Sequence, residues 1–173
     1  MMEPNYKYAR EMARKVLKDY KLKSIPTDLK KIFDTLGFEH VELDDPEDVD
    51  GMIVKIGDKP SIVVINVKKP LVRQRFTLAH ELGHIFLNHD KRDIYDAETA
   101  REQSDDISPS KPPKEIEADI FASELLVPFE HIKTHIDRIN DIEWLSQTFQ
   151  VSKTAMLLAV ENYLRRSRKR SKQ

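Results

Sequence analysis

The 173-residue chain contains no cysteine. This absence excludes disulfide bridges and thiolate zinc sites, and it is consistent with a reducing compartment. No apolar run approaches the ~20 residues of a membrane-spanning helix, so we expect no partner in a membrane. The first residues, Met-Met-Glu-Pro-Asn-Tyr-Lys, lack the apolar segment of a secretory signal. These absences predict a cytoplasmic protein.

Charge is distributed unevenly along the chain, whose net charge is −1. Six of the last nine residues are basic, and the remainder has 23 basic against 30 acidic residues, a net charge of −7. A basic terminus can bind nucleic acid, but a solubilising tail over residues 165–173 is the commoner case and the one we expect. With 39% hydrophobic residues, the rest of the chain suits one globular domain.

The most informative stretch is His80-Glu81-Leu82-Gly83-His84. On a helix, a spacing of four residues places the two histidines about 40° apart on one face. Both imidazoles can then bind one zinc ion at about 2 Å. Glu81 lies about 100° round from His80, where it can act as a general base on a water molecule. The pattern therefore predicts a zinc site with its own base, the alternative being two unremarkable histidines.

A second helix is predicted over residues 115–127, because prolines precede and follow it. Glu115 and Asp119 lie about 40° apart, beside an apolar arc whose two alanines allow close approach of another helix. Glu117 and Glu124 lie near the opposite side of this helix. We therefore expect Glu117 and Glu124 to face water.

This second helix offers the third ligand that a catalytic zinc site with two histidines still needs. Glu115 is the candidate, and Asp119 is placed to accept the ring N–H of a ligating histidine. Glu117 is the alternative ligand. The remaining interpretation is that Glu115 binds no metal and is present only because acidic residues are favourable at a helix N-terminus. Other zinc patterns fit less well. Metzincins would need Gly and His where the chain has Leu87 and Asp90, and peptide deformylases need a cysteine ligand.

The two stretches together resemble the ImmA/IrrE family of metallopeptidases from bacteria and their mobile elements. The resemblance covers roughly residues 5 to 165 and includes an upstream Asp-Gly turn and a strand that ends in asparagine. One departure is Val127, where the family more often has methionine. The matching segments are Asp50-Gly51, Ser61–Asn66, Arg73–His84 and Glu115–Pro128.

The resemblance implies a zinc-dependent endopeptidase. It implies that His80, His84 and Glu115 bind the metal and that Glu81 is catalytic. It also implies that the substrate is a helix-turn-helix repressor of a mobile element or stress regulon. Manganese is the alternative ion. The donor that stabilises the oxyanion is not identified, and His131, His135 and Tyr95 are candidates without positional support.

The predicted fold class is α+β. Strands at Phe38–Leu43, Gly51–Ile56 and Ser61–Asn66 are separated by short turns, which favours an antiparallel three-stranded meander. Ser61–Asn66 is the expected open edge, to which a peptide substrate could add as a strand. Helices are expected over Tyr6–Tyr20, from an N-cap at Thr27 to Leu36, and after Pro70.

We expect a metallopeptidase core at residues 1–127 and a helical, helix-turn-helix-like part of the same domain at 128–164. Ser152 should cap the last helix, and Trp144 and Leu157 should belong to its core. The polar stretch 89–114 is expected to be a disordered insertion, with an active-site lid as the alternative. Competing functions are a DNA- or repressor-binding regulator with a structural metal, and a zinc hydrolase that acts on a small amide.

Overall fold

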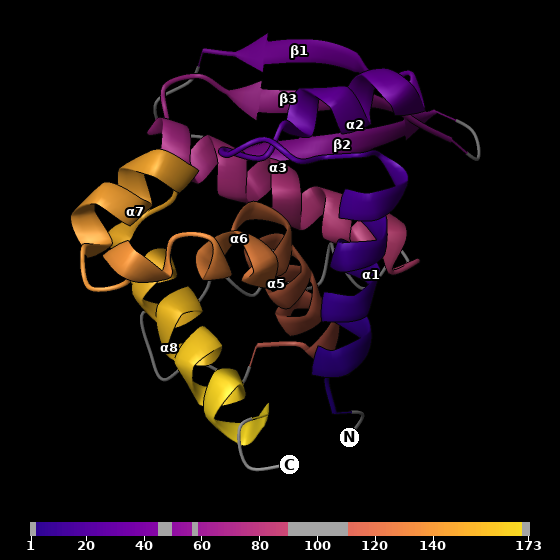
Figure 1. The fold of residues 1–173 in the computed structure, drawn as a ribbon. Helices are drawn as coiled ribbons and strands as arrows, with labels where there is room; N and C mark the ends of the chain where they lie inside the picture. The colour runs from indigo at the N-terminus through magenta and orange to yellow at the C-terminus, as the bar shows by residue number, and fades with distance from the viewer. Residues whose placement is uncertain (1–2, 45–49, 57–58, 90–110, 171–173) are drawn as a thin grey trace, which may run out of the picture.

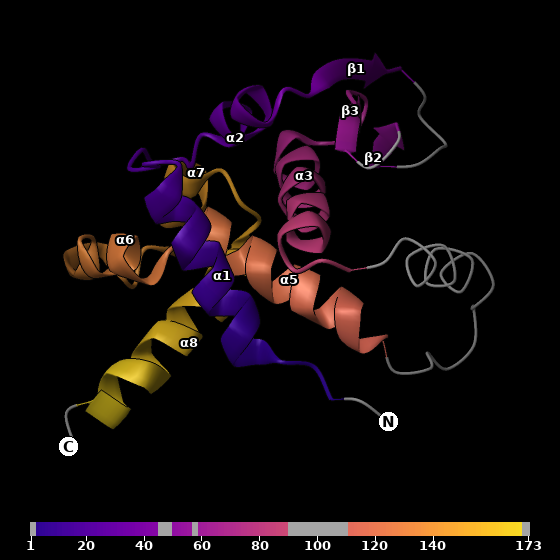
Figure 2. The same cartoon turned by 90° about the vertical axis from the view of Figure 1, so that its right-hand side faces the viewer.

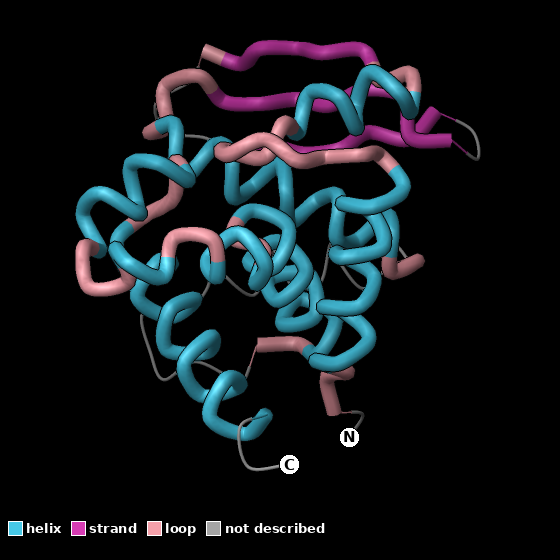
Figure 3. The backbone as a smooth tube through the Cα atoms, in the orientation of Figure 1, coloured by secondary structure: helices cyan, strands magenta, loops and turns pink. Residues whose placement is uncertain are grey.

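The computed structural model describes residues 3–44, 50–56, 59–89 and 111–170 (Figure 1). It is an α+β structure in which a small sheet lies on one side of helix α3 (Leu71–Phe86). The other helices lie mainly on the opposite side of α3, as the tube in Figure 3 also shows. The polar stretch between the two sequence motifs falls largely on residues 90–110, outside the described residues.

The sheet is mixed, which corrects the expected antiparallel meander. Its strands are β1 (Glu39–Leu43), β2 (Gly51–Ile56) and β3 (Lys59–Asn66), in the spatial order β1-β3-β2. β3 pairs antiparallel with β2 but parallel with β1. The very apolar β3 is therefore the central strand, and the charged, exposed β1 lies at an edge, where charge discourages pairing with other chains.

Helix α5 (Pro113–Leu126) lies at the centre of the helical layer and packs against α1 (Tyr6–Asp19) as well as α3 (Figure 2). Ala118, Phe121 and Ala122 are completely buried there. The small alanine side chains allow the close helix approach that the sequence predicted. The remaining elements are α2 (Leu29–Leu36), α6 (Phe129–Lys133), a 3-10 turn (Ile136–Arg138), α7 (Ile142–Phe149) and α8 (Lys153–Arg170).

The ends of the helices follow the predicted signals, with one change. Pro70 and Pro112 stand directly before α3 and α5, and Gly37 ends α2 in the left-handed region at φ 75°. The N-cap of α2 is Asp28 rather than Thr27, because its carboxylate accepts the backbone N–H of Lys31. Thr27 is buried instead.

Helices α7 and α8 form the expected pair joined by a short turn, and Ser152 caps α8 by accepting the backbone N–H of Ala155. Trp144 packs against the core, as expected. Leu157 does not, since it is 53% exposed. α8 continues to Arg170, into the segment expected to be a basic tail. Among the described residues, no helix is long and apolar enough to cross a membrane.

Candidate metal centre

Three buried side chains from two helices meet at one point beneath the surface. The Nε2 atoms of His80 and His84 on α3 lie 2.9 Å apart. Glu115, in the first turn of α5, places one carboxylate oxygen 3.3 Å from His80 Nε2 and the other 3.2 Å from His84 Nε2. The three residues are between 3% and 8% exposed. A buried set of two imidazoles and a carboxylate is a typical zinc donor set.

Close contact between α3 and α5 brings these side chains together. Gly83 lies between the two histidines along α3, and it faces Ala118 on α5. A Cβ atom added at Gly83 would lie 3.1 Å from Ala118 Cα and 3.2 Å from Ala118 O. The helices can approach this closely only because both residues are small.

Asp119, which the sequence nominated as a partner of a ligating histidine, contacts His80. The His80 Nδ1–H donates to Asp119 Oδ1 at 2.9 Å, which leaves His80 Nε2 facing Glu115. Lys111 pairs with the other oxygen of Asp119. This contact holds His80 in the tautomer whose Nε2 lone pair can bind a metal.

The ionisation of the cluster reflects these contacts. Burial lowers the pKa of His80, but its hydrogen bonds with Asp119 and Glu115 outweigh burial and raise the pKa to about 9. Burial alone would raise the pKa of Glu115, but both histidines hold it well below its usual range. For His84 burial dominates and the pKa is lowered. These contacts keep Glu115 ionised and favour a positive charge between it and the two imidazoles.

His84 has a corresponding partner that the sequence analysis did not identify. His89 Nδ1 lies 2.9 Å from His84 Nδ1, and its Nε2 lies 3.0 Å from Glu117 Oε2. The other Glu117 oxygen accepts the backbone N–H of Asn5 at 2.6 Å. Glu117 is thus half-buried, with its side chain 16% exposed, and is held between Asn5 and His89. This corrects the expectation that it faces water.

A local turn brings His89 back onto the motif helix. α3 ends at Phe86, Asn88 adopts φ 55°, and the His89 N–H donates to the His84 carbonyl at 3.0 Å. Asparagine is one of the few residues other than glycine that tolerate this left-handed conformation. In the sequence, the asparagine followed directly by a histidine just after the motif helix was the signal that could have indicated this contact.

Other residues of the first motif hold α3 in place. Arg73 pairs with Asp50 at 2.7 Å, which ties the start of α3 to the start of β2. Arg75 donates to the carbonyl of Thr27 at 2.9 Å, and the Thr27 hydroxyl donates to the carbonyl of Leu125 at the end of α5. The motif thus includes residues that orient the helix as well as candidate ligands.

Glu81 follows His80 on α3 and is half-buried.

The residues named as candidates for stabilising the oxyanion are not part of the His80, His84 and Glu115 cluster. His131 lines a groove beside α1 that contains none of the three cluster residues. The ring of His135 packs near Trp144 and Phe149. Tyr95 is outside the described residues.

The model of the family Peptidase_M78, the IrrE N-terminal-like domain, matches residues 41–161, which is more than half of the chain. The chain belongs to this metallopeptidase family. The match includes both α3 and α5, and so all of the buried His-His-Glu cluster. It agrees with the resemblance seen in the sequence motifs.

The chain is also similar in fold to a solved structure named as a Mycobacterium tuberculosis transcriptional regulator. The TM-score is 0.59 at 15% identity, and the match covers 86% of this chain and 44% of that one. The chain therefore spans less than half the length of that regulator. No curated protein matches it significantly.

Proposed function

We propose that the protein is a zinc-dependent endopeptidase in which His80, His84 and Glu115 hold the metal. The observation that carries the proposal is the convergence of these three buried donors from α3 and α5 in a chain of a metallopeptidase family. Their mutual distances of 2.9, 3.2 and 3.3 Å fit the ion. Donors bound tetrahedrally to zinc at 2.0–2.1 Å are about 3.4 Å apart.

A bound zinc ion would polarise the scissile carbonyl and lower the pKa of a water molecule towards about 7. In our proposal Glu81 accepts a proton from the attacking water and passes it to the leaving amine. Asp119 and His89 are positioning residues that orient the rings of His80 and His84. Their contacts at 2.9 Å support these roles, since partners of this kind fix the tautomer of a ligating histidine.

The prediction that Ser61–Asn66 is the open sheet edge for a substrate strand was wrong. β3, which contains Ser61–Asn66, is central, and both of its edges are occupied by β1 and β2. We propose the outer edge of β2 instead, because β2 is the edge strand in contact with α3. A substrate added there would gain main-chain hydrogen bonds beside the metal helix.

The proposed substrate is a helix-turn-helix transcriptional repressor of a mobile element or stress regulon. This part of the proposal is supported by resemblance to the ImmA/IrrE family. It is tested by co-expressing the protein with candidate regulators and measuring which one is lost. Loss with the wild type but not with Glu81→Gln would identify the substrate, and equal loss with both would reject proteolysis by this site.

The assigned roles are tested by metal analysis and cleavage assays. Glu81→Gln should keep the metal and lose cleavage, whereas Glu115→Ala should lose both. Glu39→Gln, on the exposed edge strand β1, is the matched control and should change neither. Wild-type cleavage by Glu81→Gln would contradict the general-base role. Active protein without any metal would contradict the site itself.

A DNA- or repressor-binding regulator with a structural metal is the alternative, because α7 and α8 resemble a helix-turn-helix. α8 exposes Leu157 and Leu158, at 53% and 56%. Base edges are read largely by polar and charged side chains, so we favour a helical cap. A salt-dependent DNA shift that survives His80→Ala would support the alternative.

A further inference from the structure

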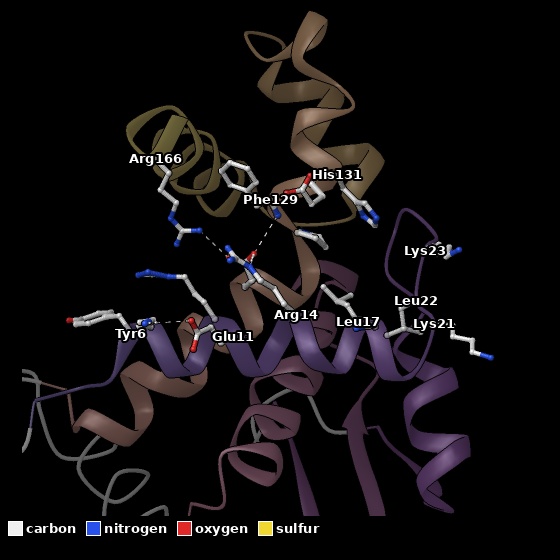
Figure 4. A pocket seen from close by; sticks show the side chains of 16 residues that line it. Tyr6, Glu11, Arg14, Leu17, Lys21, Leu22, Lys23, Phe129, His131 and Arg166 are labelled. Carbon is white, nitrogen blue, oxygen red and sulfur yellow. Dashed lines mark hydrogen bonds and ion pairs between the residues drawn. The ribbon is translucent and has the colours of Figure 1, made fainter. Parts of the chain in front are cut away.

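A basic groove of about 820 Å³ lies away from the metal centre, between α1, α6 and the end of α8 (Figure 4). Seven of its sixteen lining residues are lysine or arginine and three are glutamate. The groove thus has a formal charge of +4 on a chain whose net charge is −1. Positive charge concentrated in a concave surface attracts an acidic ligand.

One end of the groove has more guanidinium groups than its carboxylate can match. Glu124 is 7% exposed, although the sequence predicted that it faces water. Arg14 donates to one of its oxygens at 2.9 Å, and Arg166 lies 3.4 Å from the other. Burial lowers the pKa of Arg10, and the charges of Arg166 and Arg14 lower it further, which outweighs the opposite effect of Glu124. Among the described residues, Glu124 forms ion pairs with Arg14 and Arg166 but not with Arg10, whose guanidinium lies 6.0 Å from the centroid of the Tyr6 ring.

The middle of the groove is apolar. Leu17 and Leu22 lie on the α1 side, and Phe129 lies on the α6 side (Figure 4). The Phe129 ring packs against Tyr163 with its centroid 4.6 Å away, which holds it in place. Lys21 and Lys23 lie beyond the leucines, at the far end from Arg166. The groove therefore has cations at both ends and an apolar centre.

We propose that this groove binds an acidic amphipathic helical segment of a partner protein. Apolar side chains of the segment pack on the half-buried Leu17 and Phe129, while its carboxylates face Arg10, Lys18 and Lys21. Helix α1 has 14 residues and is about 21 Å long, so one wall of the groove matches a partner helix of about four turns. A helix laid in an apolar groove is a recurring mode of peptide recognition.

The chemistry favours a peptide over nucleic acid. Glu11 and Glu130 are exposed on the walls of the groove, where they would repel a phosphate backbone, which carries a charge at every nucleotide. A helical peptide can instead place its carboxylates opposite the cations and uncharged side chains opposite these two glutamates.

The groove and the metal centre occupy different parts of α5. Glu124 is nine residues after Glu115, which corresponds to about 13 Å along the helix. None of His80, His84 and Glu115 lines the groove. A segment bound in the groove therefore leaves the metal centre accessible, and binding does not depend on the proposed peptidase activity.

The probe is a fluorescein-labelled, 14-residue peptide, the length of α1, with leucines at helical spacing and glutamates elsewhere. Fluorescence anisotropy is measured with Glu81→Gln protein, so that cleavage cannot consume the probe. We expect binding, and a loss of about tenfold or more with Lys18→Glu/Lys21→Glu. The control Lys31→Glu/Lys133→Glu makes the same charge change at exposed positions outside the groove, and should keep the affinity within about twofold.

Two further measurements separate the groove from general charge attraction. A peptide with lysine in place of glutamate should bind Lys18→Glu/Lys21→Glu better than it binds the parent. At about 1 M salt, where the Debye length is about 3 Å, Leu17→Gln should still weaken the remaining binding. Circular dichroism checks that each variant is folded.

The proposal is overturned if the acidic probe does not bind, or if the groove variant and its control lose affinity equally. It is also overturned if a short duplex DNA binds more tightly than the peptide and shows the same dependence on Lys18 and Lys21. Failure of peptide cleavage in other assays would leave it intact, because every measurement here is of binding.

Discussion

Replacement of Gly83 by alanine tests whether the spacing between α3 and α5 sets the metal centre. The added Cβ would lie 3.1 Å from Ala118 Cα, and 3.2 Å from both Ala118 O and Phe121 Cδ1. Ordinary contacts between carbon atoms are about 3.5–4.0 Å. Two of the three atoms are backbone, so the helices must separate by several tenths of an ångström.

The effect on stability is a difference between two opposing contributions. Alanine in place of glycine within a helix stabilises by about 1 kcal/mol. Overpacking at the contact costs about 1–3 kcal/mol. The net destabilisation is then about 0–2 kcal/mol, which lowers Tm by a few degrees at about 2–4 °C per kcal/mol for a chain of this length.

The effect of Gly83→Ala on zinc affinity should be larger than its effect on stability, because metal sites tolerate errors of only about 0.2 Å in ligand distance. His80 and His84 lie on one side of the contact and Glu115 on the other. We therefore expect zinc affinity to fall by about tenfold or more, measured by competition with a chelator. Urea unfolding of the metal-free protein measures stability separately.

Gly37→Ala provides the matched control. Gly37 has φ 75° and no atom within 4 Å of an added Cβ, so alanine would be strained without a steric clash. This strain costs about 1–2 kcal/mol. The variant should lose stability but keep wild-type zinc affinity. If Gly83→Ala instead binds zinc like the wild type and is more stable, helix spacing does not determine the metal centre.

Three further substitutions probe contacts around the site. Asp119→Asn should lower zinc affinity about 10- to 100-fold in chelator competition, since the amide cannot orient His80 as the carboxylate does. His89→Ala should lower zinc affinity about tenfold, which is less than the complete loss expected when a ligand is removed. Complete loss with His89→Ala would show that His89 is itself a ligand. Thr27→Val should cost about 1 kcal/mol in urea unfolding, because it removes the hydrogen bond to the Leu125 carbonyl; unchanged stability would show that this bond contributes nothing.

Periodicity within one helix was sufficient to group the candidate ligands. His80 and His84 share a face whatever surrounds the helix, because a spacing of four is close to one helical turn. Glu115 and Asp119 follow the same rule on α5. The ends of the helices could also be predicted from the nearby sequence, since prolines and glycine act on the backbone of their immediate neighbours.

The predicted exposure of Glu117 and Glu124 was wrong for a physical reason. A helical wheel assumes one buried face, but α5 is covered on several sides. Glu117 accepts the N–H of Asn5, and Glu124 is held by Arg14 and Arg166. These partners come from the two ends of the chain, and no pattern within α5 indicates them.

The order of the strands in the sheet could likewise not be predicted from the sequence of each strand and its turns. Short turns between strands usually join neighbours in a sheet, so a meander was the natural expectation. The apolar β3 instead lies between β1 and β2, where both of its edges are paired.

By itself, the sequence determined which residues could bind a metal and on which helices they stand, because side-chain direction follows helical period. Only the tertiary structure decided that Glu115 meets both histidines, that His89 and Glu117 support His84, and that β2 provides the edge beside α3. Those outcomes depend on how distant segments pack, and for Glu115 and the two histidines the close approach of α3 and α5 rests on Gly83 against Ala118.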